Sequence, residues 1–348
     1  MAVVHCLKKL EPGVEITVFS NTPAATRSMH GVKAAYRWNP LSMLLKIITC
    51  DLLISGGGSL LQDVTSSRNV GYYLAVIKAA LSFKKKVMIF SQGIGPINNE
   101  KNRAKVLKVL RRCDCVTVRD SISADFLKEL SPELDVHIVS DPVMAFDRKD
   151  IDVEKEIGGL LHESGVPASS GEDRNPLLLV SMRLWKGNTF FEPVAKLLDS
   201  QIEKGWDVLL VPAHFPADKD AIEKLRELMT AKPYSIDKLL NAQQFIALTA
   251  RADKVFSMRL HGLICAAAMG VPALALSYDP KVDGFMEQAG LERFCLSCDA
   301  VNPEAANALL AELDSIQQDF IKEQNIRREK MREAAWEPAR KTAELLQK

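Results

Sequence analysis

Short runs of valine, isoleucine and leucine recur along this chain, separated by segments whose apolar residues have helical spacing. The runs lack a clean alternation of polar and apolar residues, which is typical of strands buried on both faces of a sheet. They form two series, one at Glu15–Ser20, Asp51–Ser55, Lys86–Gln92, Cys115–Arg119 and Val136–Ser140, the other at Leu177–Met182, Asp207–Val211, Lys254–Met258 and Pro272–Ser277. Strands that alternate with helices predict an α/β fold with parallel sheets.

The composition changes between the two series. Asp150–Asn175 is rich in glycine, serine and charged residues, which is typical of a connection between domains. A chain of 348 residues is also long enough for two domains. We therefore predict Rossmann-like domains at 1–150 and 176–325, a linker at 151–175, and a C-terminal helix at 326–348 that returns toward the first domain. The two domains are expected to face each other across a cleft.

The start of the chain departs from the usual order of such a domain. Met1–Leu10 is predicted as a helix that leads into the strand at Glu15–Ser20. Doubly wound domains usually begin with a strand and a turn ahead of that helix. We therefore expect the first strand of the N-terminal domain to be missing.

The overall charge and the cysteines argue against several classes of protein. A formal net charge of +1 provides no field that would attract nucleic acid. The seven cysteines are odd in number and scattered, and the pair Cys295 and Cys298 has no companion ligands, so we expect neither disulfides nor a metal. No apolar run approaches the roughly 20 residues that span a bilayer, and no signal peptide is visible. We expect a soluble, cytoplasmic protein.

Glycine-rich loops follow two predicted strands, those at residues 51–55 and 86–92. Glycine lets backbone N–H groups approach a ligand, and Ser59 is expected to cap a helix that follows the first loop. Such loops suit a phosphate or a sugar, although a plain strand-to-helix turn has the same pattern. The residues expected to contact a phosphate or an acceptor here are Gly56, Gly57, Gly58, Ser59, Gln92 and Gly93.

Two arginines stand where predicted strands end. Arg119 precedes Asp120, so it either forms an ion pair that caps the next helix or places a guanidinium in the cleft. Arg183 occupies the equivalent position after the first strand of the second half. A guanidinium at such a position can grip a carboxylate or a phosphate through two hydrogen bonds.

The densest group of candidate residues lies in Ser257–Phe285. Arg259 and His261 follow one strand at the start of a helix, and the next strand delivers Lys281 to the same edge of the sheet. A histidine between two cations at a helix N-terminus is expected to have a lowered pKa and to transfer protons near neutrality. His214, which follows another strand of this half, is a further candidate to lie in the cleft and contact the acceptor or a phosphate.

These motifs together resemble the polysaccharide pyruvyl transferase family. The resemblance extends from about Gly13 to Gly290 and depends on five segments: Met258–Ala266, Tyr278–Val282, Ile54–Asp63, Gln92–Pro96 and Val118–Asp120. Within the family the chain is most similar to the branch that pyruvylates N-acetylmannosamine in bacterial secondary cell wall polymers. The strand and Asn-x-Gly-Asp-Glu loop with which members begin are absent here.

The resemblance implies two Rossmann-like domains in a GT-B-like glycosyltransferase architecture, with phosphoenolpyruvate as donor. It implies that Arg259 and Lys281 hold the donor phosphate and carboxylate and that His261 is the acid and base. Arg119 and Arg183 are expected to add charge to the donor site. No cofactor other than this co-substrate is implied. The acceptor is expected to be a lipid-linked sugar, reached by transient contact with the inner face of the membrane.

Two other functions share part of this pattern. A nucleotide-sugar glycosyltransferase of the same fold would have similar loops and cations, with Asp279 or Asp283 as the residue that binds ribose. A glycan-binding protein without catalytic activity is a third possibility, against which the presence of His261 and its flanking cations argues.

Overall fold

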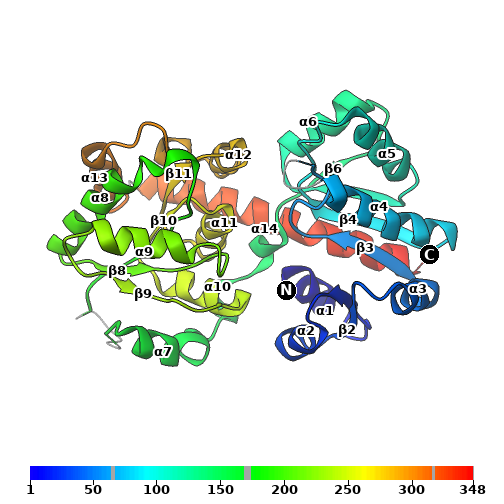
Figure 1. Ribbon diagram of the computed structural model, residues 1–348, viewed down its shortest axis with the longest axis horizontal. Helices are drawn as coiled ribbons and strands as arrows, with labels where there is room; N and C mark the ends of the chain where they lie inside the picture. Colours follow the sequence, from blue (N-terminus) through cyan, green and yellow to red (C-terminus); the bar gives the residue numbers. More distant parts are fainter. Residues whose placement is uncertain (64–66, 168–173, 316–317, 348) are drawn as a thin grey trace. The chain divides into compact units, whose positions relative to one another are not determined.

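The computed structural model describes residues 1–63, 67–167, 174–315 and 318–347. It divides into two compact units, Met1–Ala145 with Met331–Lys348, and Phe146–Lys330 (Figure 1). Each unit contains parallel strands with helices in the connections, which confirms the predicted α/β class.

The first unit contains two parallel sheets. One has the order β3-β4-β5-β6, and β1 and β2 pair separately. The strands are β1 (Thr17–Ser20), β2 (Lys33–Tyr36), β3 (Leu52–Gly56), β4 (Lys86–Gln92), β5 (Cys115–Val118) and β6 (His137–Ile138). The helices are α1 (Ala2–Leu10), α2 (Pro23–His30), α3 (Pro40–Thr49), α4 (Ser67–Ser82), α5 (Glu100–Leu110) and α6 (Ser121–Leu130), with a 3-10 turn η1 (Pro142–Ala145).

Strand β4 passes through the core of this unit. Its residues from Val87 to Gln92 are all buried, as the unbroken apolar run predicts for a strand covered on both faces. The last part of α14 (Gln318–Gln347) belongs to the same unit. Lys86 donates a hydrogen bond to the carbonyl of Leu345 at 2.6 Å, and the Thr342 hydroxyl lies 3.2 Å from the sulfur of Met88. The helix therefore packs beside β4.

The second unit has one six-stranded parallel sheet with the order β12-β11-β10-β7-β8-β9. The strands are β7 (Leu177–Ser181), β8 (Asp207–Leu210), β9 (Tyr234–Ser235), β10 (Lys254–Ser257), β11 (Ala273–Ser277) and β12 (Cys295–Ser297). The helices are α7 (Val153–Ser164), α8 (Phe191–Glu203), α9 (Lys219–Leu228), α10 (Ala242–Arg251), α11 (Leu260–Met269), α12 (Pro280–Ala289) and α13 (Pro303–Glu312), with 3-10 turns η2 (Arg148–Asp150), η3 (Lys186–Asn188) and η4 (Glu292–Phe294).

Part of the segment predicted as a linker is instead helix α7, which packs against α10. Its buried residues Ile157, Leu160 and Leu161 follow the i, i+3, i+4 spacing of an amphipathic helix. Gly158 and Gly159 lie within the helix, because the burial of this face outweighs the low helix propensity of glycine. Residues 168–173 of the predicted linker lie outside the described residues.

The C-terminal helix, predicted at 326–348, begins earlier, at Gln318, and continues through Pro338. Among the described residues, no helix combines the length and the apolar character that crossing a membrane requires.

Candidate functional site

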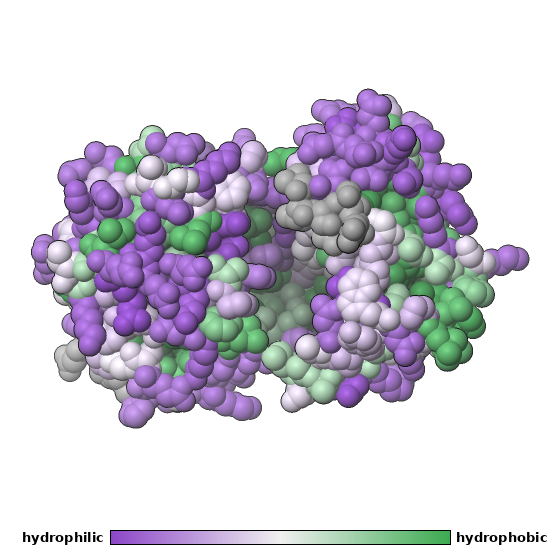
Figure 2. Space-filling model, viewed as in Figure 1, coloured by the Kyte–Doolittle hydropathy of each residue, from purple (hydrophilic) through white to green (hydrophobic). Residues whose placement is uncertain are grey.

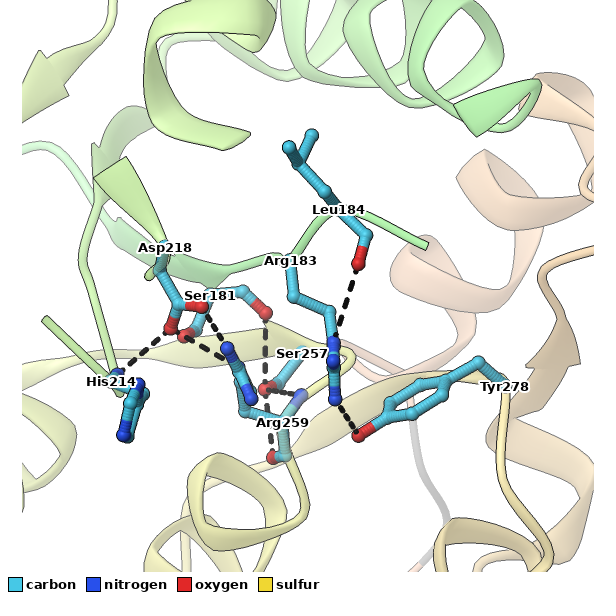
Figure 3. A network of polar contacts seen from close by, with 8 residues as sticks. All are labelled: Ser181, Arg183, Leu184, His214, Asp218, Ser257, Arg259 and Tyr278. Carbon is cyan, nitrogen blue, oxygen red and sulfur yellow. Dashed lines mark hydrogen bonds and ion pairs between the residues drawn. The ribbon is translucent and has the colours of Figure 1, made fainter. Parts of the chain in front are cut away.

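The strand order of the second unit creates a switch point between β7 and β10. From β7 the chain proceeds to β8 and β9 on one side, and it then returns to place β10 on the other side of β7. Open α/β sheets bind ligands at the carboxyl ends of the two strands that flank such a point. Arg183 follows β7 and Arg259 follows β10, so both arginines lie at this position (Figure 3).

Asp218 holds Arg259 in place. This carboxylate is fully buried and accepts hydrogen bonds from Nε of Arg259, at 3.1 Å, and from its Nη2. It also accepts from the backbone N–H of His214 at 2.8 Å. Nη1 of Arg259 has no hydrogen-bond partner among the described residues, so the pairing fixes the plane of the guanidinium and leaves one edge available (Figure 3). Asp218, which lies four residues beyond the candidate His214, was not among the predicted site residues.

Ser257 organises the turn from β10 into α11. Its hydroxyl oxygen lies 2.9 Å from the N–H of Arg259, from which it accepts, and 3.0 Å from the carbonyl of the same residue. A Cβ on Gly262 would lie 2.5 Å from this oxygen and 3.1 Å from Cβ of Ser257, so any other residue at that position would force Ser257 to shift. The Arg-Leu-His-Gly motif is therefore partly a packing requirement.

His261 and Lys281 lie in the first turns of neighbouring helices. Arg259 is the N-cap residue of α11, and the exposed His261 follows at the second position of the helix. Asp279 caps α12 by accepting from the N–H of Lys281 at 2.9 Å. Because β10 and β11 are adjacent and parallel, both helices begin at the same edge of the sheet.

An aromatic pair surrounds Arg183. Its Nη1 donates to the hydroxyl of Tyr278 at 3.0 Å, and its guanidinium carbon lies 5.1 Å and 4.9 Å from the ring centres of Trp185 and Tyr278. The two rings are 4.7 Å apart. Cation–π contact and the hydrogen bond together orient this side chain. Sequence reasoning missed the part played by Trp185.

In the first unit, backbone hydrogen bonds join the two glycine-rich segments. Gly57 and Gly58 have φ of 78° and 65°, values that favour glycine. The N–H of Gly57 donates to the carbonyl of Phe90 at 3.3 Å, and the N–H of Gly93 donates to the carbonyl of Gly58 at 3.0 Å. These backbone donors are therefore occupied within the protein, and both loops lie at the carboxyl ends of β3 and β4.

Ser59 does not cap a helix, contrary to expectation. Leu61 forms a β-bridge with Ile94, so the chain continues alongside the neighbouring loop, and residues 59–63 are not helical. The hydroxyl of Ser59 instead accepts a hydrogen bond from Nη2 of Arg119 at 3.3 Å. A Cβ on Gly93 would lie 2.7 Å from that hydroxyl, which explains glycine at this position.

Arg119 is a buried ion-pair residue, with 7% of its surface exposed. Its Nη1 lies 3.1 Å from Oδ2 of Asp141, and its Nε lies 3.5 Å from Oδ2 of Asp120. Asp120 also caps α6 by accepting from the N–H of Ser123. Asp120 thus both caps the helix and pairs with Arg119, which is one of the two predicted alternatives. The guanidinium also pairs with Asp141, which the sequence did not indicate.

Gln92, the last residue of β4, is a fully buried polar residue at the same edge of the sheet. Its side-chain nitrogen donates to the hydroxyl of Ser55 at 2.8 Å, whereas its Oε1 and the hydroxyl of Ser91 have no hydrogen-bond partner among the described residues. Buried polar atoms of this kind are uncommon and favour a role beyond packing.

No group of potential metal ligands occurs in the described part of the chain. Burial raises the pKa of the Cys295 thiol to about 12 and also raises that of Cys298. Both thiols are therefore protonated near neutral pH, which does not suit a reactive redox cysteine.

The predicted residues fall into one group in each unit. The second unit places five of them after β7, β8, β10 and β11, which are neighbours in the sheet: Arg183, His214, Arg259, His261 and Lys281. The first unit places the others after β3, β4 and β5: Gly56, Gly57, Gly58, Ser59, Gln92, Gly93 and Arg119.

Comparison with known proteins shows to which family this chain belongs. The model of the polysaccharide pyruvyl transferase family matches residues 1–280, which include both groups except Lys281. The chain belongs to this family. In a polysaccharide pyruvyl transferase the expected activity is that of a transferase that acts on a sugar, and the site residues named above lie within the matched region or, for Lys281, directly after it.

Solved structures with a similar fold cover almost the whole chain. A glycosyltransferase from Rickettsia africae has 14% identity and a TM-score of 0.60, with 99% of this chain and 93% of that chain covered. The UDP-GlcNAc 2-epimerase from Neisseria meningitidis bound to UDP-GlcNAc has 15% identity and a TM-score of 0.61, with 99% and 95% covered. Anabaena Alr3699/HepE in complex with UDP-glucose has 14% identity and a TM-score of 0.56, with 99% and 93% covered. The pyruvyl transferase thus has the predicted GT-B-like fold of two Rossmann-like units.

Proposed function

We propose that this protein transfers the pyruvyl group of phosphoenolpyruvate to two hydroxyls of one sugar as a ketal, with release of phosphate. Family membership supports the transferase class, and the cations at the strand ends of the second unit support an anionic donor. Phosphoenolpyruvate carries a phosphate and a carboxylate, and Arg183, Arg259 and Lys281 all follow neighbouring strands there. Arg259 carries the proposal, because Asp218 holds its guanidinium with one edge available.

The proposed chemistry requires proton transfer at each step. Protonation of the donor methylene carbon gives oxocarbenium character at the neighbouring carbon, to which one sugar hydroxyl adds. Loss of phosphate and attack by the second hydroxyl close the ketal, and the two hydroxyl protons balance the proton on the new methyl group and the proton on the phosphate. His261 is the proposed proton carrier, since it is exposed in the first turn of α11. Arg183, Arg259 and Lys281 offset the charge of the departing phosphate.

The proposal also covers the acceptor sugar, the place of the reaction in the cell and the roles of the residues in the first unit. The acceptor is N-acetylmannosamine of a lipid-linked cell wall polymer precursor, which the protein reaches in the cytoplasm by peripheral contact with the inner membrane face. No cofactor besides the co-substrate takes part. The loops of the first unit, with Gln92 and Ser59, contact the acceptor or a phosphate, and the unpartnered Oε1 of Gln92 supports a ligand there. Arg119 adds charge to the donor site. His214 is the second candidate for proton transfer.

One experiment tests the activity directly. The protein is incubated with phosphoenolpyruvate and a panel of synthetic and lipid-linked sugars, while phosphate release and product mass are followed. The expected result is phosphate release that depends on the acceptor, together with a product heavier by one pyruvyl ketal. Absence of both with every acceptor, in a protein that melts cooperatively, contradicts the proposal.

A nucleotide-sugar glycosyltransferase is the alternative, and the UDP-sugar complexes among the solved structures of similar fold favour it. Such an enzyme needs an acidic residue to bind ribose. Asp279 already caps α12, and Asp283 lies 3.5 Å from the thiol of Cys295. Replacing phosphoenolpyruvate by UDP-sugars in the same assay separates the two functions, because only one donor supports product formation.

A further inference from the structure

Helix α3 of the first unit carries an exposed apolar stripe. Leu41, Leu44, Leu45 and Ile48 have exposed fractions of 69%, 37%, 55% and 39%. Their spacing of i, i+3, i+4 and i+7 places all four on one face of the helix. Figure 2 shows the hydrophobic colour over α3, at the lower right of the view.

This stripe is wider than the part of the helix that packs against the core. Ile47, with 2% of its surface exposed, belongs to the core of the first unit and lies one residue, about 100° around the helix, from Ile48. Helix α3 therefore has one broad apolar face, whose edge at Ile47 is buried and whose remainder is in solvent. A surface helix of a globular protein needs only the buried part, so the exposed part calls for a partner.

Aromatic and basic residues flank the stripe. Trp38, which is 58% exposed, directly precedes the cap of α3. At the other end, the parallel register pairs Leu52 with Lys86, so Lys85 lies beside the residues that follow the helix, Cys50 and Asp51. Phe83, 43% exposed, and the exposed Lys84 adjoin it in the chain. The exposed Asp51, next to Cys50 in the chain, adds one acidic side chain there.

We propose that α3, with Trp38 and Phe83–Lys85, is a docking surface for an anionic lipid bilayer. A short amphipathic helix can lie in the membrane interface with its apolar face among the acyl chains. Tryptophan is enriched at the level of the headgroups, and lysines attract anionic lipids. We call these residues the α3 surface.

The size of the α3 surface distinguishes a bilayer from a second protein chain. Stable protein interfaces use about 20–30 residues from each partner, whereas α3 has ten residues and presents four apolar side chains. A bilayer has no such minimum, because the affinity increases with each side chain inserted. The lysines are complementary to anionic lipid, which a copy of the same basic surface is not.

This inference is independent of the donor chemistry and can be tested without a substrate. The full-length protein is sedimented with vesicles of phosphatidylglycerol and phosphatidylethanolamine, and separately with phosphatidylcholine vesicles. We expect binding to the anionic vesicles that decreases as salt increases. Leu41→Asn with Leu45→Asn should weaken it by about ten- to a hundredfold. Lys84→Gln and Lys85→Gln should each weaken it by about fivefold.

A matched control separates the α3 surface from general stickiness. Leu239 of the second unit is 59% exposed, so Leu239→Asn removes a comparable apolar side chain elsewhere and should leave vesicle binding unchanged. Melting temperatures of all variants should be close to that of the original protein, because the replaced side chains are exposed or, for Lys85, half-buried. Three outcomes overturn the proposal: no binding to anionic vesicles, binding that survives the double substitution, or a dimer in solution that the double substitution dissociates.

Discussion

Asp218→Asn tests whether one buried carboxylate positions Arg259. The substitution keeps the size of the side chain but removes its charge and replaces one acceptor oxygen by a donor NH₂ group. Asp218 accepts hydrogen bonds from Nε and Nη2 of Arg259 and from the N–H of His214. An asparagine has only one acceptor oxygen for these three donors. At least one donor is therefore left facing another donor in a fully buried position.

The size of the effect follows from burial. Removing one partner of a fully buried ion pair costs about 3–5 kcal/mol of stability. Arg259 is not fully buried, since 18% of its side chain is exposed, and water can partly solvate the charge that the substitution leaves uncompensated. We therefore expect a loss of about 2–4 kcal/mol. In a domain of about 150–250 residues each kcal/mol shifts Tm by about 2–4 °C, so Tm should fall by about 5–15 °C.

Thermal unfolding followed by circular dichroism measures this loss. The exposed Asp220 lies in the first turn of α9, the helix that begins directly after Asp218. As a control, Asp220→Asn should change stability by less than about 1 kcal/mol. If Asp218 acts through Arg259, Arg259→Gln should cost much less in the Asp218→Asn protein than in the original one. An Asp218→Asn protein with normal Tm and normal turnover would refute the positioning role.

Three further predictions concern the same strand ends. His261→Ala and His261→Gln should both lower turnover by about 10²–10⁴-fold with a normal Tm, because an amide cannot transfer a proton; a Gln variant that retains activity excludes the acid–base role. Arg259→Ala and Lys281→Ala should each weaken phosphoenolpyruvate binding about ten- to a hundredfold in titration calorimetry, and unchanged affinity in both removes them from the donor site. Gly262→Ala should destabilise the protein by about 1–3 kcal/mol in thermal unfolding, since the new Cβ meets Ser257, and a higher Tm would contradict this.

The sequence alone was sufficient for the class of fold and for the strand ends that carry candidate residues. Apolar runs without alternation predict strands covered on both faces, and in a parallel sheet the residues after such strands share one edge. Arg259 and Lys281 follow adjacent strands for this reason. The predicted GT-B-like fold is confirmed, as is membership of the polysaccharide pyruvyl transferase family.

Local patterns were a poorer guide where packing competes with propensity. The paired glycines at 158 and 159 predicted a linker, but the burial of Leu160 and Leu161 holds that segment in helix α7. Ser59 was expected to cap a helix, but the bridge between Leu61 and Ile94 keeps the chain extended beyond it. In both cases contacts with residues distant in the chain decide the conformation, and a local pattern does not contain them.

What only the tertiary structure decided is which partner each charged side chain has. The sequence places Arg119 beside Asp120, but the fold adds Asp141 and buries the arginine between them. It likewise brings Asp218 to Arg259 and Tyr278 to Arg183, across separations of 41 and 95 residues. Residue types and spacing determine where a strand ends and which side chains follow it. The choice of partner depends on how neighbouring strands and loops pack, because a buried charge is stable only beside a group that the fold brings to it.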